Sequence, residues 1–182
     1  MDPEVRRALD FAGVAHKGQV RKGLPIEPYI THPAGVVEDA QRLKLSVDAQ
    51  VAAALHDVIE DTPTTYGDLE RERFSARAIF LVRLLSKWWP EGTPPDLVAI
   101  YKRAYYAAIQ TDPEAVQLKL LDRARNLEDM LKVVNTKRRW AEKYYRKTVS
   151  EIGPLTLFNP NPAVDRLFYE AVGNLCIELA GN

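Results

Sequence analysis

Imidazole and carboxylate side chains gather at one point of this sequence. His56, Asp57, Glu60 and Asp61 follow directly on the apolar run 51–55, which is typical of a buried helix. Side chains four positions apart share a helix face, so a continuous helix would place His56 above Glu60 and Asp57 above Asp61. Carboxylates at a helix C-terminus oppose the helix dipole. A divalent cation would relieve that repulsion, so the segment predicts a metal site.

Two residues elsewhere in the chain could complete such a site. His32 stands before a proline at the expected start of a helix, and Asp122 lies inside a helical apolar pattern. Helix interiors rarely bury an unpaired carboxylate, so Asp122 is expected to bind the metal or to pair with Lys119 or Arg125. Asn126 shares the face of Asp122 and could hydrogen-bond a ligand. Imidazole and carboxylate ligands favour Mn, Fe or Zn over Ca or Mg alone.

Helix start signals recur along the chain and predict the elements that must position these residues. Prolines follow good N-cap residues at Asp2, Asp112 and Asn161, and Thr65 with Asp68 forms a capping box. Single-residue caps are expected at Ser46, Ser75 and Thr136. Apolar residues recur three or four positions apart behind these signals, and no sustained alternation indicates strands. The sequence therefore predicts an all-α fold of about eight to ten helices.

Two stretches are rich in glycine and proline. Residues 17–31 are expected to form a long loop between the first two helices, and residues 88–96 to form a second irregular segment. No internal repeat or low-complexity linker marks a boundary, so residues 1–182 are expected to form one domain.

Composition excludes several classes of function. Lys and Arg number 25, Asp and Glu number 25, and 46% of residues are apolar, which disfavours disorder and an extended nucleic-acid groove. Cys176 is the single cysteine, so no internal disulfide and no cysteine-rich zinc site can form. No apolar run reaches the roughly 18 residues of a membrane span. We expect a cytoplasmic protein without nucleic-acid or membrane partners, and an oligomer is compatible with the sequence.

The chain resembles the hydrolase domain of the RelA/SpoT homologue family. Within that family it is similar to the stand-alone small alarmone hydrolases, such as the metazoan SpoT homologues. The matching segments are residues 15–22 (AHKGQVRK), 28–33 (PYITHP), 53–62 (AALHDVIEDT) and 119–127 (KLLDRARNL). They occur in family order, and the resemblance spans about residues 4–170.

The resemblance implies a single HD-domain helical fold and a metal-dependent hydrolase. It implies one Mn²⁺ ion, with Zn²⁺ or Fe²⁺ as alternatives, and four ligands: His32, His56, Asp57 and Asp122. It also implies that Glu60 and Asp61 orient and activate the attacking water. The implied reaction removes the 3′-pyrophosphate of the alarmone (p)ppGpp and leaves GDP or GTP. No synthetase domain follows before the chain ends, so we expect hydrolysis without synthesis.

The same resemblance places the nucleotide. Arg21 and Lys22 match the basic pair that lines the family's pocket, and Asn126 matches its ribose-side contact. A cationic loop beside the metal suits a leaving pyrophosphate. Tyr29 could stack on the base or pack the loop, and Tyr144, on a basic helical segment, could reach a phosphate.

Two positions depart from the family pattern. Arg125 stands where the family usually has His or Tyr, and Glu128 stands where it commonly has Arg. The two side chains could pair at the pocket wall, which makes the adenosine analogue (p)ppApp a second expected substrate. A phosphatase acting on another phosphorylated nucleotide such as NADPH, and a non-catalytic alarmone-binding module, are the alternative functions.

Overall fold

Helical apolar spacing and the N-cap signals translate into helices along nearly the whole chain. The computed structural model describes residues 1–90 and 92–181. In that part of the chain it contains ten α-helices: α1 (Pro3–Ala15), α2 (Thr31–Arg42), α3 (Val47–Leu55), α4 (Val58–Asp61), α5 (Tyr66–Arg71), α6 (Ala76–Leu85), α7 (Pro95–Gln110), α8 (Pro113–Val133), α9 (Arg138–Lys147) and α10 (Pro162–Ala180). A π-helical turn (Thr148–Ile152) and a 3₁₀ segment (Gly153–Phe158) join α9 to α10. The predicted all-α class is confirmed.

Most of the predicted caps are confirmed at their residues. The side chains of Asp2, Asp112 and Asn161 accept hydrogen bonds from backbone N–H groups at the starts of α1, α8 and α10. The capping box of Thr65 and Asp68 is complete at α5. Capping oxygens at the starts of α3 and α6 come from Ser46 and Ser75.

Two predicted helix starts differ in the structure. Thr136 does not cap α9, because its hydroxyl donates to the carbonyl oxygen of Val133 at 3.1 Å and so closes the end of α8. Helix α2 begins at Thr31, before the His32–Pro33 pair, because Ile30 already has a helical backbone (φ −57°, ψ −21°). His32 therefore lies inside the first turn of α2.

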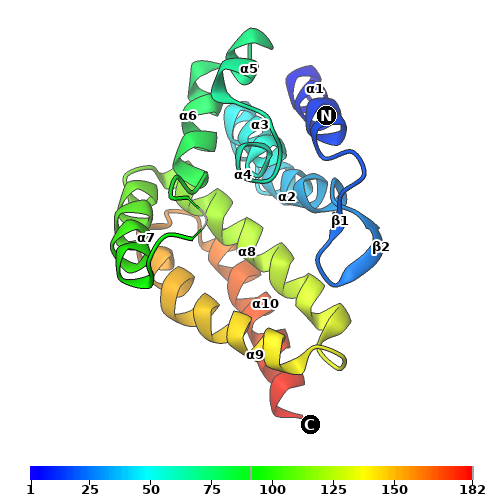
Figure 1. Cartoon of the computed structure of the whole chain (residues 1–182), viewed down its shortest axis with the longest axis vertical. Helices are drawn as coiled ribbons and strands as arrows, with labels where there is room; N and C mark the ends of the chain where they lie inside the picture. Colours follow the sequence, from blue (N-terminus) through cyan, green and yellow to red (C-terminus); the bar gives the residue numbers. More distant parts are fainter. Residues whose placement is uncertain (91, 182) are drawn as a thin grey trace.

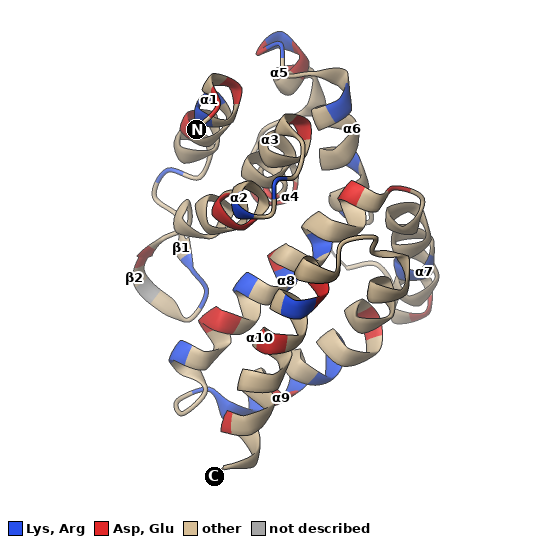
Figure 2. Ribbon diagram, turned by 180° about the vertical axis from the view of Figure 1, so that it is seen from behind, with Lys and Arg blue, Asp and Glu red and all other residues tan. Residues whose placement is uncertain are grey.

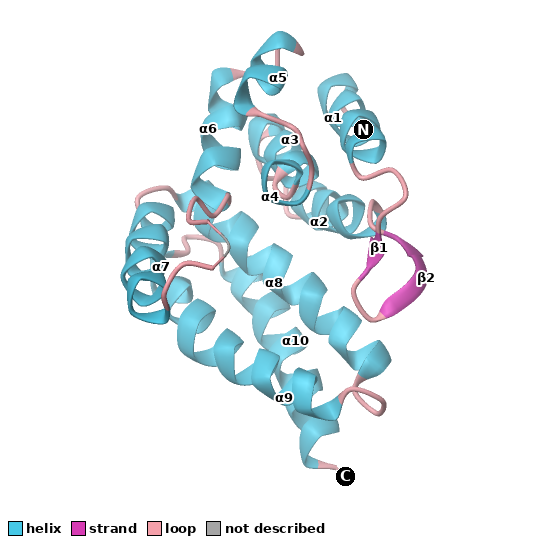
Figure 3. Ribbon diagram, in the orientation of Figure 1, coloured by secondary structure: helices cyan, strands magenta, loops and turns pink. Residues whose placement is uncertain are grey.

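The predicted loop at residues 17–31 is partly wrong, because it contains a β-hairpin. Strands β1 (Val20–Arg21) and β2 (Leu24–Pro28) pair antiparallel, and they are the only strands among the described residues (Figure 3). Gly23 makes the turn with φ +92°, a conformation that favours glycine. Strands this short carry no readable alternation, which is why the sequence pattern did not indicate them.

Helix α8 is the element on which both parts of the core pack. It contacts α2, α3, α6 and α7 on one side and α9 and α10 on the other, and it runs through the middle of the molecule (Figure 1). Leu118 and Leu121 belong to the apolar cluster built with α1, α2, α3 and α6. Ala124 and Leu127 belong to a second cluster, built with α9 and α10. Asp122 therefore lies where the two clusters meet.

Charged residues lie along α8 even though the helix is central (Figure 2). Lys119 and Asp122 are 8% and 7% exposed, and charges at this depth require partners. In the described part of the chain, the helices are all too short or too polar to cross a membrane.

The start of α8 provides a test of how firmly this helix is held. Asp112 accepts from the N–H groups of Glu114 and Ala115 and from the guanidinium of Arg77. We expect Asp112→Ala to lower the free energy of unfolding by about 1–2 kcal/mol, because the cap and the partner of Arg77 are lost together. Denaturant unfolding measures this loss. Asp2→Ala removes the equivalent cap of α1 and should have a smaller effect.

The effect of Asp112 should also depend on pH. Burial raises the pKa of Asp112, but the hydrogen bonds from Arg77 and the helix N–H groups outweigh it and lower this pKa below its ordinary value. Stabilisation by a carboxylate with a lowered pKa is complete above about pH 4 and is lost as the pH falls through the folded-state pKa. The difference between wild type and Asp112→Ala should therefore shrink in acid. A difference that stays constant to pH 2 would contradict this account.

Candidate metal centre

Four of the predicted site residues come from three separate places in the fold: the start of α2, the connection between α3 and α4, and the middle of α8. His32 lies in the first turn of α2, and His56 directly follows α3. Asp57 precedes α4, and Asp122 lies in the middle of α8. The two halves of the site are therefore assembled by the packing of α8 against α2 and α3.

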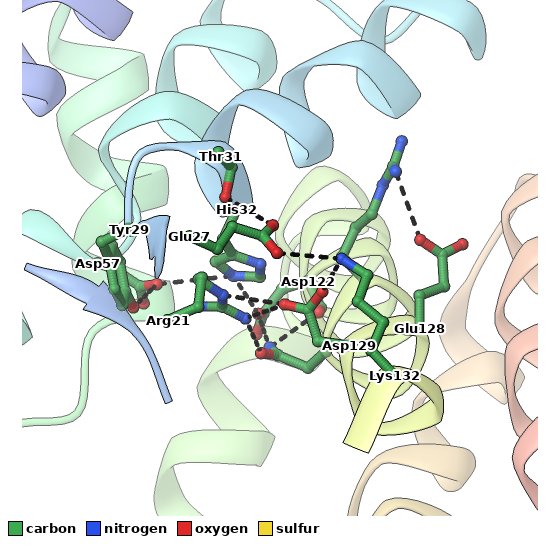
Figure 4. A network of polar contacts seen from close by, with 12 residues as sticks. Arg21, Glu27, Tyr29, Thr31, His32, Asp57, Asp122, Glu128, Asp129 and Lys132 are labelled. Carbon is green, nitrogen blue, oxygen red and sulfur yellow. Dashed lines mark hydrogen bonds and ion pairs between the residues drawn. The ribbon is translucent and has the colours of Figure 1, made fainter. Parts of the chain in front are cut away.

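The structure brings these side chains together. His32, His56 and Asp57 each offer a ligand atom within 4.8 Å of the others. Asp122 joins them from α8: its Oδ1 lies 3.1 Å from Nε2 of His32 and 3.8 Å from Nε2 of His56. Nε2 of His56 is also 3.1 Å from Oδ2 of Asp57. Two imidazole nitrogens and two carboxylates thus surround one point. Figure 4 shows three of these four side chains, those of His32, Asp57 and Asp122.

The hydrogen bonds of His56 fit a cation at this point. Nδ1 of His56 lies 2.8 Å from the carbonyl oxygen of Ala53, and because a carbonyl only accepts, Nδ1 carries the proton. In the neutral ring this leaves the lone pair of Nε2 directed at the site. Nε2 is buried and makes no well-aligned hydrogen bond among the described residues, although Oδ2 of Asp57 lies 3.1 Å away. A nitrogen and carboxylate donor set of this kind suits Mn, Fe or Zn.

The carboxylates and histidines of the cluster shift one another's pKa values toward the charged forms. Burial raises the pKa of Asp57, but the neighbouring His56 lowers it well below its ordinary range. Burial likewise raises the pKa of Asp122, and Lys119 with the two histidines lowers it well below its usual value. The pKa of His56 is lowered by burial but raised well above its ordinary value by Asp57 and Asp122. A cation entering the site would take the place of the His56 proton.

Asp122 is held from two further sides. Nζ of Lys119 lies 2.9 Å from Oδ2 of Asp122. Nδ2 of Asn126 donates to Oδ1 of Asp122 at 2.6 Å and to its backbone carbonyl at 3.0 Å. The sequence predicted that Asp122 would either join the metal site or pair with a basic residue. In the structure it lies beside the histidines and also pairs with Lys119. Arg125 takes no part in this pairing.

Tyr29 links Asp57 to Asp61. Its hydroxyl lies 2.7 Å from Oδ2 of Asp57 and 2.9 Å from Oδ2 of Asp61. Burial, together with the two carboxylates, raises the pKa of Tyr29, so the hydroxyl keeps its proton and donates it to one of them. The ring of Tyr29 stacks on His16 with centroids 4.5 Å apart. His16 is 3% exposed, so this stacking contact is buried.

The predicted pair Glu60 and Asp61 is divided between two partners. The continuous helix expected through His56 is wrong, because α3 ends at Leu55 and α4 begins only at Val58. Glu60 accepts from the backbone N–H of Lys87 at 2.7 Å and from its Nζ at 2.6 Å. Asp61 faces Tyr29.

The hairpin residues differ in their surroundings. Arg21 is buried and donates to Asp129 and Asn126. Lys22 is exposed, with its Nζ 5.7 Å from the ring centre of Trp140.

Two predicted substrate contacts already have partners within the chain. Arg125 pairs with Asp39, and its Nη1 lies 3.4 Å from Glu128, so the expected pairing of Arg125 with Glu128 is present. Tyr144 packs under the guanidinium of Arg123 at 4.4 Å. Burial raises the pKa of Tyr144 to about 12.

Beside His32 there is a cavity of about 90 Å³. Its lining includes residues that sequence reasoning missed, namely Glu27, Asp129 and Lys132. Asp129 stands three positions after Asn126 and Lys132 three after Asp129, so their helix face was readable. The hairpin that supplies Glu27 was not.

Comparison with known proteins adds three findings. A sequence model of the HD domain matches residues 8–149. A guanosine-3′,5′-bis(diphosphate) 3′-pyrophosphohydrolase from Aquifex aeolicus is 34% identical over 152 residues, which are 84% of this chain and 21% of the relative. The bifunctional (p)ppGpp synthase/hydrolase SpoT of Escherichia coli is 34% identical over 153 residues, 83% of this chain and 21% of the relative. The chain spans about a fifth of the length of these relatives.

A solved structure, described as a metazoan ortholog of SpoT that hydrolyzes ppGpp and plays a role in starvation responses, has the same fold. It superimposes with a TM-score of 0.74 at 23% identity and covers 93% of this chain and 96% of that one. At this identity the likeness shows the fold alone.

The donor set predicts a measurable metal dependence. We expect MnCl₂ added to metal-free protein to stabilise it by about 2.7 kcal/mol at 100 times the dissociation constant. Asp57→Asn should lose most of this effect, because a charged ligand becomes a neutral one. Calorimetric titration and thermal melting measure it, with exposed Asp10→Asn as the matched control. Equal affinity in Asp57→Asn and wild type would argue against the site.

Proposed function

Because this chain belongs to the HD-domain family, we propose that it hydrolyses the 3′-pyrophosphate of an alarmone nucleotide. The products from (p)ppGpp would be GDP or GTP and pyrophosphate. The observation that carries the proposal is the meeting of His32, His56, Asp57 and Asp122 at one buried point. The names of the bacterial relatives support the choice of substrate. Residues 1–182 are proposed to act as one domain, and the cytoplasmic location stays a prediction.

We propose that these four residues hold one Mn²⁺ ion, with Zn²⁺ or Fe²⁺ as alternatives. Such an ion supplies a Lewis acid that polarises a phosphoryl oxygen and acidifies water. Lys119 and Asn126 keep the Asp122 carboxylate ionised and oriented toward the histidines. This arrangement agrees with the donor preferences of the ion.

We assign the proton transfer to Asp61 and Glu60. Asp61 is joined to Asp57 through the hydroxyl of Tyr29, so it lies beside the proposed ligand and can accept a proton from the attacking water. The backbone N–H and the ammonium group of Lys87 hold Glu60 at the preceding position of the chain. The two carboxylates then share the tasks of orienting the water and accepting its proton.

The phosphate groups require cations and polar donors near the metal. Arg21 and Lys22 on the hairpin are proposed to face the leaving pyrophosphate, and Asn126 and Tyr144 to contact the rest of the nucleotide. Tyr29, whose ring is stacked on His16, is assigned to positioning carboxylates in preference to stacking on a base.

Product release from ppGpp, ppApp and NADPH, measured in parallel with Mn²⁺, tests the proposal. We expect pyrophosphate from at least one alarmone, and none with EDTA or with Asp57→Ala. Glu60→Gln should lower kcat by about 10²- to 10⁴-fold, the usual contribution of general acid–base catalysis, while metal binding is retained. If NADPH is the only compound hydrolysed and the product is orthophosphate, the alarmone assignment is wrong and the substrate is another phosphorylated nucleotide. No turnover by folded, metal-loaded protein would favour the binding module.

Base preference is expected to depend on Arg125. This side chain packs against Gly35 of α2 and pairs with Asp39 and Glu128 at the wall of the cavity. Arg125→Tyr should change the ratio of kcat/KM for ppGpp to that for ppApp by about fivefold or more, since about 1 kcal/mol of differential binding is at stake. Arg139→Tyr, exposed on α9, is the control. If Arg125→Tyr leaves the ratio of kcat/KM for ppGpp to that for ppApp unchanged, Arg125 does not set base preference.

A further inference from the structure

Asp129 of α8 forms an ion pair with the guanidinium of Arg21. The proposed function assigns this same guanidinium to a phosphate group of the substrate. Nε and Nη2 of Arg21 lie 2.9 and 2.8 Å from Oδ2 of Asp129. Nη2 also donates to Oδ1 of Asn126 at 2.8 Å. Figure 4 shows Arg21 reaching across the site to Asp129 of α8. The hairpin is thereby tied to α8 by a buried ion pair.

This pairing uses the contacts that a phosphate would need. A guanidinium binds an oxyanion in bidentate fashion through either its Nε/Nη2 edge or its Nη1/Nη2 edge. Asp129 takes the first edge, and Asn126 takes one N–H group of the second. Bidentate binding of a phosphate by Arg21 therefore requires that one of these two side chains be displaced.

The surroundings make Asp129 a strong competitor. Arg21 and Asp129 have side chains only 8% and 14% exposed, so water screens their attraction weakly. Lys132 donates to the other oxygen of Asp129 at 2.8 Å. Burial raises the pKa of Asp129, but Lys132 and Arg21 lower it below its ordinary value. The carboxylate is therefore ionised at neutral pH.

We propose that Asp129 sets substrate affinity by competing with the phosphate chain for Arg21. Binding of a pyrophosphate group to Arg21 displaces Asp129, and the ion pair between Arg21 and Asp129 forms again when the group leaves. The carboxylate therefore weakens the binding of both the substrate and the pyrophosphate product. This inference rests on the proposed function. If Asp129 only held Arg21 in place, its removal would weaken phosphate binding, whereas competition predicts that its removal strengthens phosphate binding.

The sign of the effect of Asp129→Asn tests the inference. Inorganic pyrophosphate is titrated calorimetrically into the full chain at a fixed Mn²⁺ concentration. We expect Asp129→Asn to bind pyrophosphate about three- to tenfold more tightly than wild type, because this ratio corresponds to the free energy of about one ion pair. KM for the nucleotide and the inhibition constant of pyrophosphate should fall by the same factor. Asp129→Ser repeats the test, and thermal melting confirms that each variant folds.

Two controls separate this competition from a general charge effect. Glu128→Gln removes the adjacent negative charge, which pairs with Arg125 and not with Arg21, and should change pyrophosphate affinity less than Asp129→Asn does. In the Arg21→Gln background, Asp129→Asn should give no gain. Unchanged or weaker pyrophosphate binding by the folded Asp129 variants would overturn the inference, as would an equal gain in Glu128→Gln. Because binding is measured without turnover, these results stand apart from the failure or success of alarmone hydrolysis.

Discussion

The burial of an ionised carboxylate in the middle of α8 is the constraint on which the rest of the structure depends. Asp122 lies between two apolar clusters, and water cannot stabilise its charge there. Lys119, Asn126 and the two histidines supply the missing interactions. The packing of α2 and α3 against α8 therefore satisfies a charge as well as an apolar surface. A site that must concentrate negative charge is also one that a divalent cation can complete.

Around this centre the chain uses a second set of charges in matched pairs. Arg21 meets Asp129, Arg125 meets Asp39, and Glu60 meets Lys87. Each pair joins elements that are distant in sequence. Two of these pairs include a residue of the cavity lining, Asp129 or Arg125. All three pairs neutralise a cation that could otherwise bind a phosphate group. Under the proposed function, substrate binding at such a site is an exchange of ion pairs, and its strength depends on the carboxylates as much as on the arginines.

Local signals predicted much of the fold, because they act over a few residues. A capping side chain such as Asp112 or Thr65 bonds to an N–H group two or three positions away, and such short-range geometry can be read from residue types alone. The hairpin at Val20–Pro28 could not be read in this way. Its strands are too short for a pattern, and Arg21 holds it to α8 by contacts more than 100 positions away along the chain.

The sequence by itself determined the helical class, most helix starts and the residue types that converge at the candidate metal centre. Spacing also placed Asp122 and Asn126 on one face of α8. Only the tertiary structure decided what those side chains meet. It broke the helix between His56 and Glu60, turned Glu60 to Lys87, and paired Arg21 with Asp129. Helical periodicity depends on neighbours along the chain, whereas the partner of a buried charge depends on which elements pack together.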